Sequence, residues 1–346
     1  LVLGPGESKT YGFKFQWAED YDAVRQVLVD EGKIDVHVVP GMTVPTNLVA
    51  QFALHTTQMV HSVQAEFPGD TEIQFLGNNG LYRIYEVAFS RLGENLLTVN
   101  YGNSQEMFLE FFVTEPLETL ISKRAQFLES KQIKNPSKWY DGLYPEWNMA
   151  SQTLVTPDNY DLLVGFVQYV VAADDAGLSR PAFLALKNVT MPVQDEVTSL
   201  DRYIDKFVWG GLQRTTRETY SYGIYGVRDW YVNRYSSDPG ENGQLHMWRT
   251  YDYPHIITMY EAMYRIAKDH PQITTQLTAQ QYLERAYGTA MALFEIPYSI
   301  VPTEFWNPYH KGYMNESVIP GLIEVLEAEG MATEAADLRS EWHLSL

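Results

Sequence analysis

The spacing of apolar side chains changes once along the chain, from a period of two to a helical period. Between residues 35 and 114, apolar and polar positions alternate in short runs that are separated by Pro-Gly, Gly-Asp, Asn-Asn-Gly and Gly-Asn turn signals. Such alternation is typical of strands with one buried face. Seven such runs in about 80 residues favour an immunoglobulin-like β-sandwich, which we predict for residues 34–115.

The residues before this sandwich carry a weaker signal. Residues 10–17 alternate at period two and predict an antiparallel strand, for which the neighbouring sequence offers no partner. Residues 18–32 have apolar side chains at helical spacing and end at Gly32, a residue that commonly terminates helices. One strand and one helix cannot form a core, so we interpret residues 1–33 as the tail of an N-terminal β-sandwich domain.

The second half of the chain has a helical period. Residues 116–150 predict a linker, with an amphipathic helix over 116–131 and then a Trp-rich connector. Residues 151–346 favour an (α/α) toroid of helical hairpins that is incomplete, because the chain supplies about half of the helices that a closed toroid needs. The fold class is therefore multidomain β plus α. Helices are predicted over 157–173, 180–188, 193–208, 252–268, 278–294, 315–329 and 332–342.

Composition narrows the classes of function. The net charge of −19 repels a phosphate backbone, so we expect no nucleic-acid partner. No run of about 18 apolar residues is present, so we expect no membrane insertion. The chain has no cysteine, and His246, His255 and His310 lack the HxH and HExxH spacings of zinc sites. We therefore expect no metal and no cofactor.

The segment between residues 209 and 255 combines aromatic rings with Arg, Asp and His in loop-like sequence, within a chain that has 24 Tyr, 15 Phe and 8 Trp. Trp and Tyr rings cover the apolar face of a sugar, while the polar side chains hydrogen-bond its hydroxyls. We therefore predict a carbohydrate substrate. The candidate substrate-binding residues, here and in the later loop at residues 300–316, are Trp209, Trp230, Arg234, His246, Trp248, Arg249, Tyr251, His255, Trp306 and His310.

Three carboxylates are candidates for catalysis, because inverting glycosidases require one acid and one base on opposite sides of the sugar. Asp229 lies between a cation and a ring, and its structural alternative is a salt bridge to Arg228 or Arg234. Asp252 lies at a predicted helix start, where the alternative is a helix N-cap. Glu304 lies in an aromatic loop, and its alternative is a solvated surface position.

Six strings of this chain carry a resemblance to known proteins. They are VVPGMTVPT (38–46), RLGENLLTVNYGN (91–103), EFFVTEPLETLI (110–121), NPSKWYDGL (135–143), FVWGGLQRT (207–215) and WRTYDYPHI (248–256). Together they resemble a microbial family of six-hairpin-glycosidase-like proteins. The resemblance covers most of the chain and implies an order of β-sandwich, immunoglobulin-like module, Trp-rich connector and helical toroid. Members are longer at both ends, which implies further domains of the same polypeptide, and they are secreted, which implies an extracellular or periplasmic location.

These observations lead to one hypothesis and two alternatives. The hypothesis is a secreted glycoside hydrolase that cleaves a poly- or oligosaccharide by carboxylate acid and base chemistry. The first alternative is a polysaccharide lyase, in which Tyr251 or His255 takes a proton and Arg249 or Asn233 neutralises a uronate carboxylate. The negative net charge speaks against an anionic substrate. The second alternative is a glycan-binding protein without catalysis.

Overall fold

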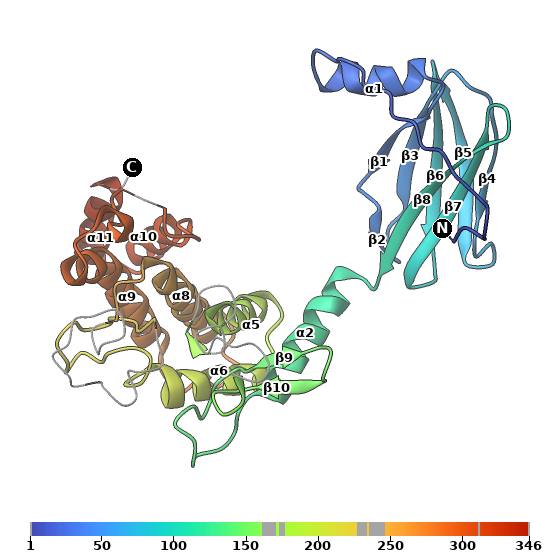
Figure 1. Cartoon of the computed structure of the whole chain (residues 1–346). Helices are drawn as coiled ribbons and strands as arrows, with labels where there is room; N and C mark the ends of the chain where they lie inside the picture. The colour runs from blue at the N-terminus through green and yellow to red at the C-terminus, as the bar shows by residue number, and fades with distance from the viewer. Residues whose placement is uncertain are drawn as a thin grey trace. The chain divides into compact units, whose positions relative to one another are not determined.

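The chain divides into two compact units, Leu1–Leu120 and Ile121–Leu346, and the boundary lies inside helix α2 (Leu117–Lys131) (Figure 1). Two sheets make up most of the first unit, and helices dominate the second. The predicted mixture of β and α structure is therefore confirmed. This description comes from a computed structural model, and the residues that the structure describes are 2–160, 171–172, 177–226, 234, 246–310 and 312–344.

Two four-stranded sheets form the first unit. One has the order β1-β3-β6-β5, and the other has the order β2-β8-β7-β4, in which β2 runs parallel to β8. All seven runs predicted as strands are confirmed, and β2 is an additional short strand. The bounds are β1 (Asp35–Val39), β2 (Thr43–Pro45), β3 (Ala50–His55), β4 (Val60–Ala65), β5 (Thr71–Asn79), β6 (Tyr82–Phe89), β7 (Gly93–Tyr101) and β8 (Gln105–Thr114).

One apolar core joins the two sheets. Phe52 of β3 and Phe111 of β8 come from different sheets, and their ring centroids are 6.4 Å apart. Val87 of β6 and Leu97 of β7 are fully buried in the same cluster. Alternate residues of each strand point to this core. The apolar positions of the period-two pattern are therefore the ones on the buried face of each sheet.

The strand predicted over residues 10–17 is wrong. These residues form no regular element and pair with no described strand, and the side chains of Phe13, Phe15 and Trp17 are 87%, 96% and 89% exposed. Alternation predicts a strand only where a sheet edge is available to pair with it. The helix predicted to follow is confirmed as α1 (Tyr21–Asp30), which Asp20 caps by accepting a hydrogen bond from the Ala23 amide at 2.8 Å.

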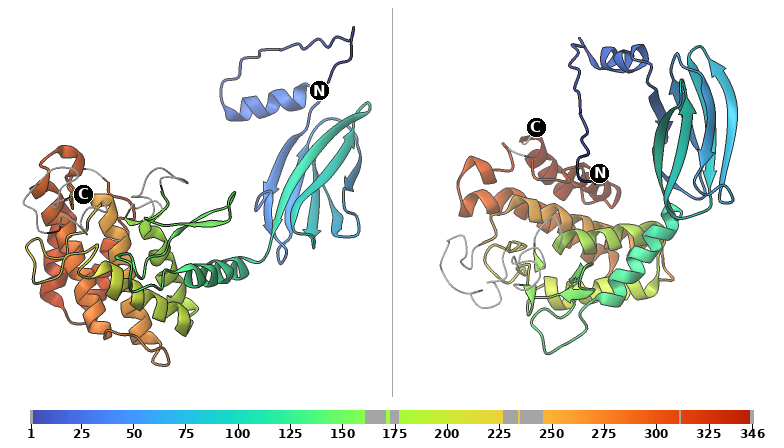
Figure 2. Two further views of the ribbon diagram at one scale, coloured as in Figure 1. Left: turned by 60° about the horizontal axis from the view of Figure 1, so that its bottom comes forward. Right: turned by 45° about the vertical axis from the view of Figure 1, so that its right-hand side comes forward.

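The second unit packs its helices around one large apolar core, and Figure 2 shows its helices from two further sides. Helix α8 contacts both α9 and α5, and α10 contacts α11. Among the described residues, no helix is both long and apolar enough to cross a membrane. The bounds are β9 (Glu146–Asn148), β10 (Thr153–Val155), α5 (Ser179–Thr190), α6 (Gln194–Arg202), α8 (Tyr253–Asp269), α9 (Ala279–Ile300), α10 (Val318–Ala328) and α11 (Ala332–Leu344).

The helices predicted over this half of the chain are confirmed wherever the structure describes them. The one predicted over 193–208 forms as α6 followed by a π-helical turn, η2 (Tyr203–Val208). Most of the one predicted over 157–173 lies outside the described residues. The toroidal arrangement and the immunoglobulin-like type of the sandwich stay predictions.

The segment predicted as a connector contributes to the core of the second unit. Tyr140, Leu143 and Tyr144 are buried there. Gly142 has φ +89°, and a Cβ atom at this position would lie 2.9 Å from the carbonyl oxygen of Arg202. Only glycine fits this turn, because it combines a left-handed backbone with a close approach of another helix.

Candidate functional site

Three candidate side chains meet at a single glycine. The Gly226 amide donates to the carbonyl oxygen of His246 at 2.9 Å, so two distant segments lie side by side. A Cβ atom on Gly226 would lie 3.0 Å from Asp252 Oδ2, 3.3 Å from His246 Cε1 and 3.5 Å from Arg249 Cβ. We call His246, Arg249 and Asp252 the Gly226 cluster. Gly226 was not a candidate from the sequence, because a close approach between distant segments leaves no local signal.

Asp252 is held by Arg249. Its side chain is 0% exposed, and its Oδ1 accepts a hydrogen bond from Arg249 Nε at 3.2 Å, while 29% of the Arg249 side chain is exposed. Asp252 ends the 3-10 turn η3 (Thr250–Asp252) and precedes α8, but its side chain makes no capping hydrogen bond and its backbone is already helical. Asp252 therefore stands at the N-cap position of α8 without making the side-chain hydrogen bond of a cap, and its carboxylate instead orients the guanidinium.

His246 is a buried neutral imidazole. It is 6% exposed, and burial, with a smaller contribution from the charge of Arg249, lowers its pKa from 6.5 to about 4. Neither ring nitrogen of His246 has a hydrogen-bond partner among the described residues. Strongly perturbed pKa values and unsatisfied buried polar atoms both occur preferentially at functional sites.

An aromatic wall, formed by Trp248, Tyr251 and Trp306, adjoins the cluster. The His246 and Trp248 ring centroids are 4.3 Å apart, and Trp306 lies 4.4 Å from Trp248 and 5.8 Å from Tyr251. Trp248 Nε1 is buried and, within the described part of the chain, has no hydrogen-bond partner. Trp306 therefore brings the loop after α9 against the segment before α8, as a shared site requires.

Glu304 and His310 form an exposed ion pair next to this wall in the sequence. Glu304 begins the 3-10 turn η4 (Glu304–Trp306), and its carboxylate contacts His310 Nδ1. The two side chains are 67% and 60% exposed. A carboxylate so well solvated is available to a ligand.

His255 has both ring nitrogens engaged by the fold. Nδ1 lies 3.2 Å from the carbonyl oxygen of Tyr251, and Nε2 lies 3.4 Å from Asn315 Nδ2. An amide nitrogen can only donate, so Nε2 accepts and Nδ1 carries the proton that it donates to the carbonyl oxygen. These two contacts hold the imidazole of His255 in place in the first turn of α8.

Trp209 and Arg234 contact other parts of the helical unit. The Arg285 guanidinium lies over the Trp209 ring at 4.0 Å, and the Tyr222 ring is 5.6 Å away. Arg234 donates to both carboxylate oxygens of Glu218, at 2.8 and 3.0 Å. Among the described residues, Glu218 is therefore the salt-bridge partner of Arg234. Asp229, for which a bridge to Arg234 was considered, lies outside the described residues. The packing of Trp209 and Arg234 stabilises the loop that leads to Gly226.

The remaining candidates, Asp229, Trp230 and Asn233, lie outside the described residues. In the described part of the chain, no group of three or more His, Asp or Glu side chains is arranged to hold a metal ion.

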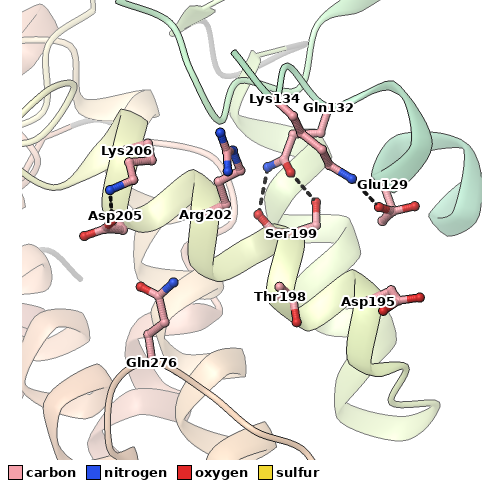
Figure 3. A pocket seen from close by; sticks show the side chains of 10 residues that line it. All are labelled: Glu129, Gln132, Lys134, Asp195, Thr198, Ser199, Arg202, Asp205, Lys206 and Gln276. Carbon is pink, nitrogen blue, oxygen red and sulfur yellow. Dashed lines mark hydrogen bonds and ion pairs between the residues drawn. The ribbon is translucent and has the colours of Figure 1, made fainter. Parts of the chain in front are cut away.

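A separate hollow of about 340 Å³ opens beside α6 (Figure 3). Its rim carries two ion pairs, Lys134 with Glu129 at 2.6 Å and Lys206 with Asp205 at 2.7 Å. The buried side chain of Ser199 donates to Gln132 at 2.9 Å on its wall. Because these charges are paired with one another, the hollow presents little net charge to a ligand.

Comparison with known proteins gives a family and a fold. The sequence profile of a family described as Family of unknown function (DUF5695) matches residues 1–344. A solved structure named Polysaccharide Lyase BACCELL_00875 is similar, with a TM-score of 0.64 and 18% sequence identity, over 95% of this chain and 42% of that one. No curated protein matches the sequence. The chain thus spans less than half the length of the solved structure with which it shares a fold.

Proposed function

The chain belongs to the DUF5695 family, and from that premise we propose that it carries a polysaccharide-processing site whose chemistry is β-elimination at a uronate unit. One observation carries the proposal. Two buried ring groups, the imidazole of His246 and the indole N–H of Trp248, lie side by side without hydrogen-bond partners among the described residues, next to a cation and an aromatic wall. The name of the structurally similar protein supports the same reaction class.

The proposed reaction needs a neutral base and a cation. The base takes the proton from the carbon next to the uronate carboxylate, the electron pair of that bond forms a carbon–carbon double bond, and the bond to the leaving oxygen breaks. The leaving oxygen then takes a proton, and the products are one saturated and one unsaturated sugar end. Because negative charge develops on the carboxylate, a guanidinium close to it lowers the barrier.

The Gly226 cluster supplies these parts. His246 is the base, since its lowered pKa keeps it neutral at pH 7. Arg249, the more exposed member of the ion pair, binds the uronate carboxylate, and a bound carboxylate offsets the positive charge that helps to depress the pKa of His246. Asp252 is a positioning residue that holds Arg249. Trp248 and Trp306 contact the sugar ring.

Hydrolysis is the second candidate, and the exposed carboxylate of Glu304 favours it. Glu304 lies two residues before Trp306 of the aromatic wall, and its carboxylate is solvated. An inverting glycosidase would pair it with a second carboxylate about 6.5–9.5 Å away. Asp252 is the carboxylate of the Gly226 cluster, but its burial and its ion pair with Arg249 favour a positioning role.

We also propose that the two sheets form an immunoglobulin-like sandwich and that the helices form part of an (α/α) toroid. The order β1-β3-β6-β5 in one sheet and β4-β7-β8 in the other supports an immunoglobulin-like sandwich. The pairwise packing of the helices supports part of an (α/α) toroid. An extracellular or periplasmic location would expose such a site to polysaccharides.

The test is an assay of the products. The protein is incubated with uronate-containing and neutral polysaccharides, and both new reducing ends and ultraviolet absorbance are followed. Elimination yields both signals on the uronate polymers, because the new double bond is conjugated with the carboxyl group. Reducing ends without ultraviolet absorbance, together with loss of turnover in Glu304→Gln, would instead establish hydrolysis.

A further inference from the structure

Helix α2 and the hairpin of β9 and β10 lie side by side in the second unit (Figures 1 and 2). A second hollow lies between them. Its volume is about 180 Å³, and it is lined by α2, the β9 hairpin and the start of α5. Helix α2 is anchored beneath it by Ala125 and Leu128, which are buried in the core of the unit. The hollow is therefore part of a fixed surface.

Aromatic rings form the centre of this hollow. Phe127 of α2 and Trp147 of β9 meet edge to face, with their centroids 5.6 Å apart and their planes at 84°. Both rings are partly exposed, and Met149 at the tip of the hairpin is 79% exposed. A partly exposed indole beside a phenyl ring is a surface on which the apolar face of a pyranose can rest.

Three cations surround these rings. Lys131 Nζ lies 5.1 Å from the Trp147 ring centroid, and the Arg124 guanidinium lies 5.7 Å from that of Phe127. Among the described residues, neither Arg124 nor Lys131 has a carboxylate partner. Arg180 is buried on the same wall, where it donates to Glu146. The hollow therefore has a positive charge excess within a chain whose net charge is −19.

We propose that this hollow binds a hexuronate unit of an acidic polysaccharide, with Trp147 and Phe127 against the ring and Arg124 and Lys131 at its carboxylate. The ligand class rests on the proposed function, whereas the site itself rests on the hollow, its rings and its unpaired cations. Carboxylates favour cations that are free of other partners. The acidic remainder of the surface repels a polyanion, so the ligand concentrates at this positive hollow.

Fluorine NMR of the protein labelled with 5-fluorotryptophan tests the site directly. The resonance of Trp147 is assigned by its loss in Trp147→Phe, and the probe is trigalacturonate, with maltotriose as the neutral comparison. We expect trigalacturonate to shift the Trp147 resonance, with weaker binding at higher ionic strength, and maltotriose to leave it in place. The double variant Arg124→Gln/Lys131→Gln should bind at least about tenfold more weakly at this site.

The matched control is Lys206→Gln/Arg339→Gln, which removes two cations from ion pairs elsewhere on the same unit. Its affinity for trigalacturonate should equal that of the unaltered protein. Absence of a Trp147 shift, or an equal affinity in the Arg124→Gln/Lys131→Gln variant, would overturn the inference even if uronate polymers are cleaved. A Trp147 shift without any turnover would leave this binding site standing and overturn the proposed function instead.

Discussion

Arg249 donates from Nε to Oδ1 of Asp252 at 3.2 Å, and the carboxylate that accepts this hydrogen bond has no exposed surface. A buried carboxylate that loses its cation retains an uncompensated charge. The pair therefore links stability to function, because the same contact that keeps Asp252 buried also orients the guanidinium toward the candidate site.

Replacing the cation of this pair should destabilise the fold. We expect Arg249→Gln to lower the free energy of unfolding by about 3 kcal/mol, measured by urea denaturation at pH 7. Arg339→Gln is the control, since Arg339 pairs with Glu327 on the exposed surface and its loss should cost less than about 1 kcal/mol. Equal effects of the two substitutions would mean that the Arg249 pair is not a buried interaction.

His246 should make stability depend on pH. Its pKa is about 4 in the folded protein and 6.5 in the unfolded chain, so the unfolded state takes up the proton first as the pH falls. The contribution of neutral His246 to the free energy of unfolding is complete above pH 6.5 and is lost between pH 6.5 and about 4. Acidification from pH 7 to pH 5 should therefore remove about 2 kcal/mol of this stability.

The measurement compares urea denaturation of the unaltered protein and of His246→Gln at both pH values. The variant should lose about 2 kcal/mol less stability on acidification, because glutamine does not titrate. Parallel losses in the two proteins would show that His246 is accessible to protons in the folded state.

A methyl group on Gly226 should disturb the site more than the fold. Gly226→Ala would place Cβ 3.0 Å from Asp252 Oδ2 and 3.3 Å from His246 Cε1, so one of the two side chains must shift by a few tenths of an ångström. We expect turnover to fall by about tenfold or more, as is common when catalytic groups are displaced. Gly321→Ala in α10 is the control, because nothing lies within 4 Å of its added Cβ. That substitution should stabilise the helix by about 0.5–1 kcal/mol and leave turnover unchanged.

Removal of a partly exposed ring of the aromatic wall should weaken substrate binding. Trp306→Ala deletes the ring that contacts both Trp248 and Tyr251, and we expect KM to rise by about fivefold or more with a smaller change in kcat. Trp17→Ala removes an 89% exposed ring in the other unit and should change neither constant. A fall in kcat alone would place Trp306 in the reaction and not in binding.

The sequence predicted most elements because their signals are local. The alternation of β3 is present in the structure, and the helix predicted over residues 278–294 forms as α9, which begins with a capping box of Thr278 and Gln281. Residues 10–17 have an equally clear alternation, but they have no sheet edge to pair with. The sequence of a segment does not show whether a partner strand is available to it. Tyr144 of the predicted connector is buried in the core for a related reason, because its partners lie far along the chain.

The candidate site was predicted in part. Trp248 and Trp306 were chosen for their side-chain chemistry and do come together, although 57 positions separate them in the sequence. Trp209 had the same chemistry, but its ring is covered by Arg285 of α9. The local sequence around each tryptophan does not show which ring joins the aromatic wall and which ring is covered. The exposure of each ring depends on the packing of helices that are distant in the sequence.

The most direct test of the account is the initial rate at which ultraviolet-absorbing product forms from a uronate-containing polysaccharide, compared between the unaltered protein and His246→Gln. The proposed role of His246 as base predicts a rate at least about a hundredfold lower in the variant, with the two proteins equally folded at pH 7. An unchanged rate would contradict the assignment of the reaction to the Gly226 cluster.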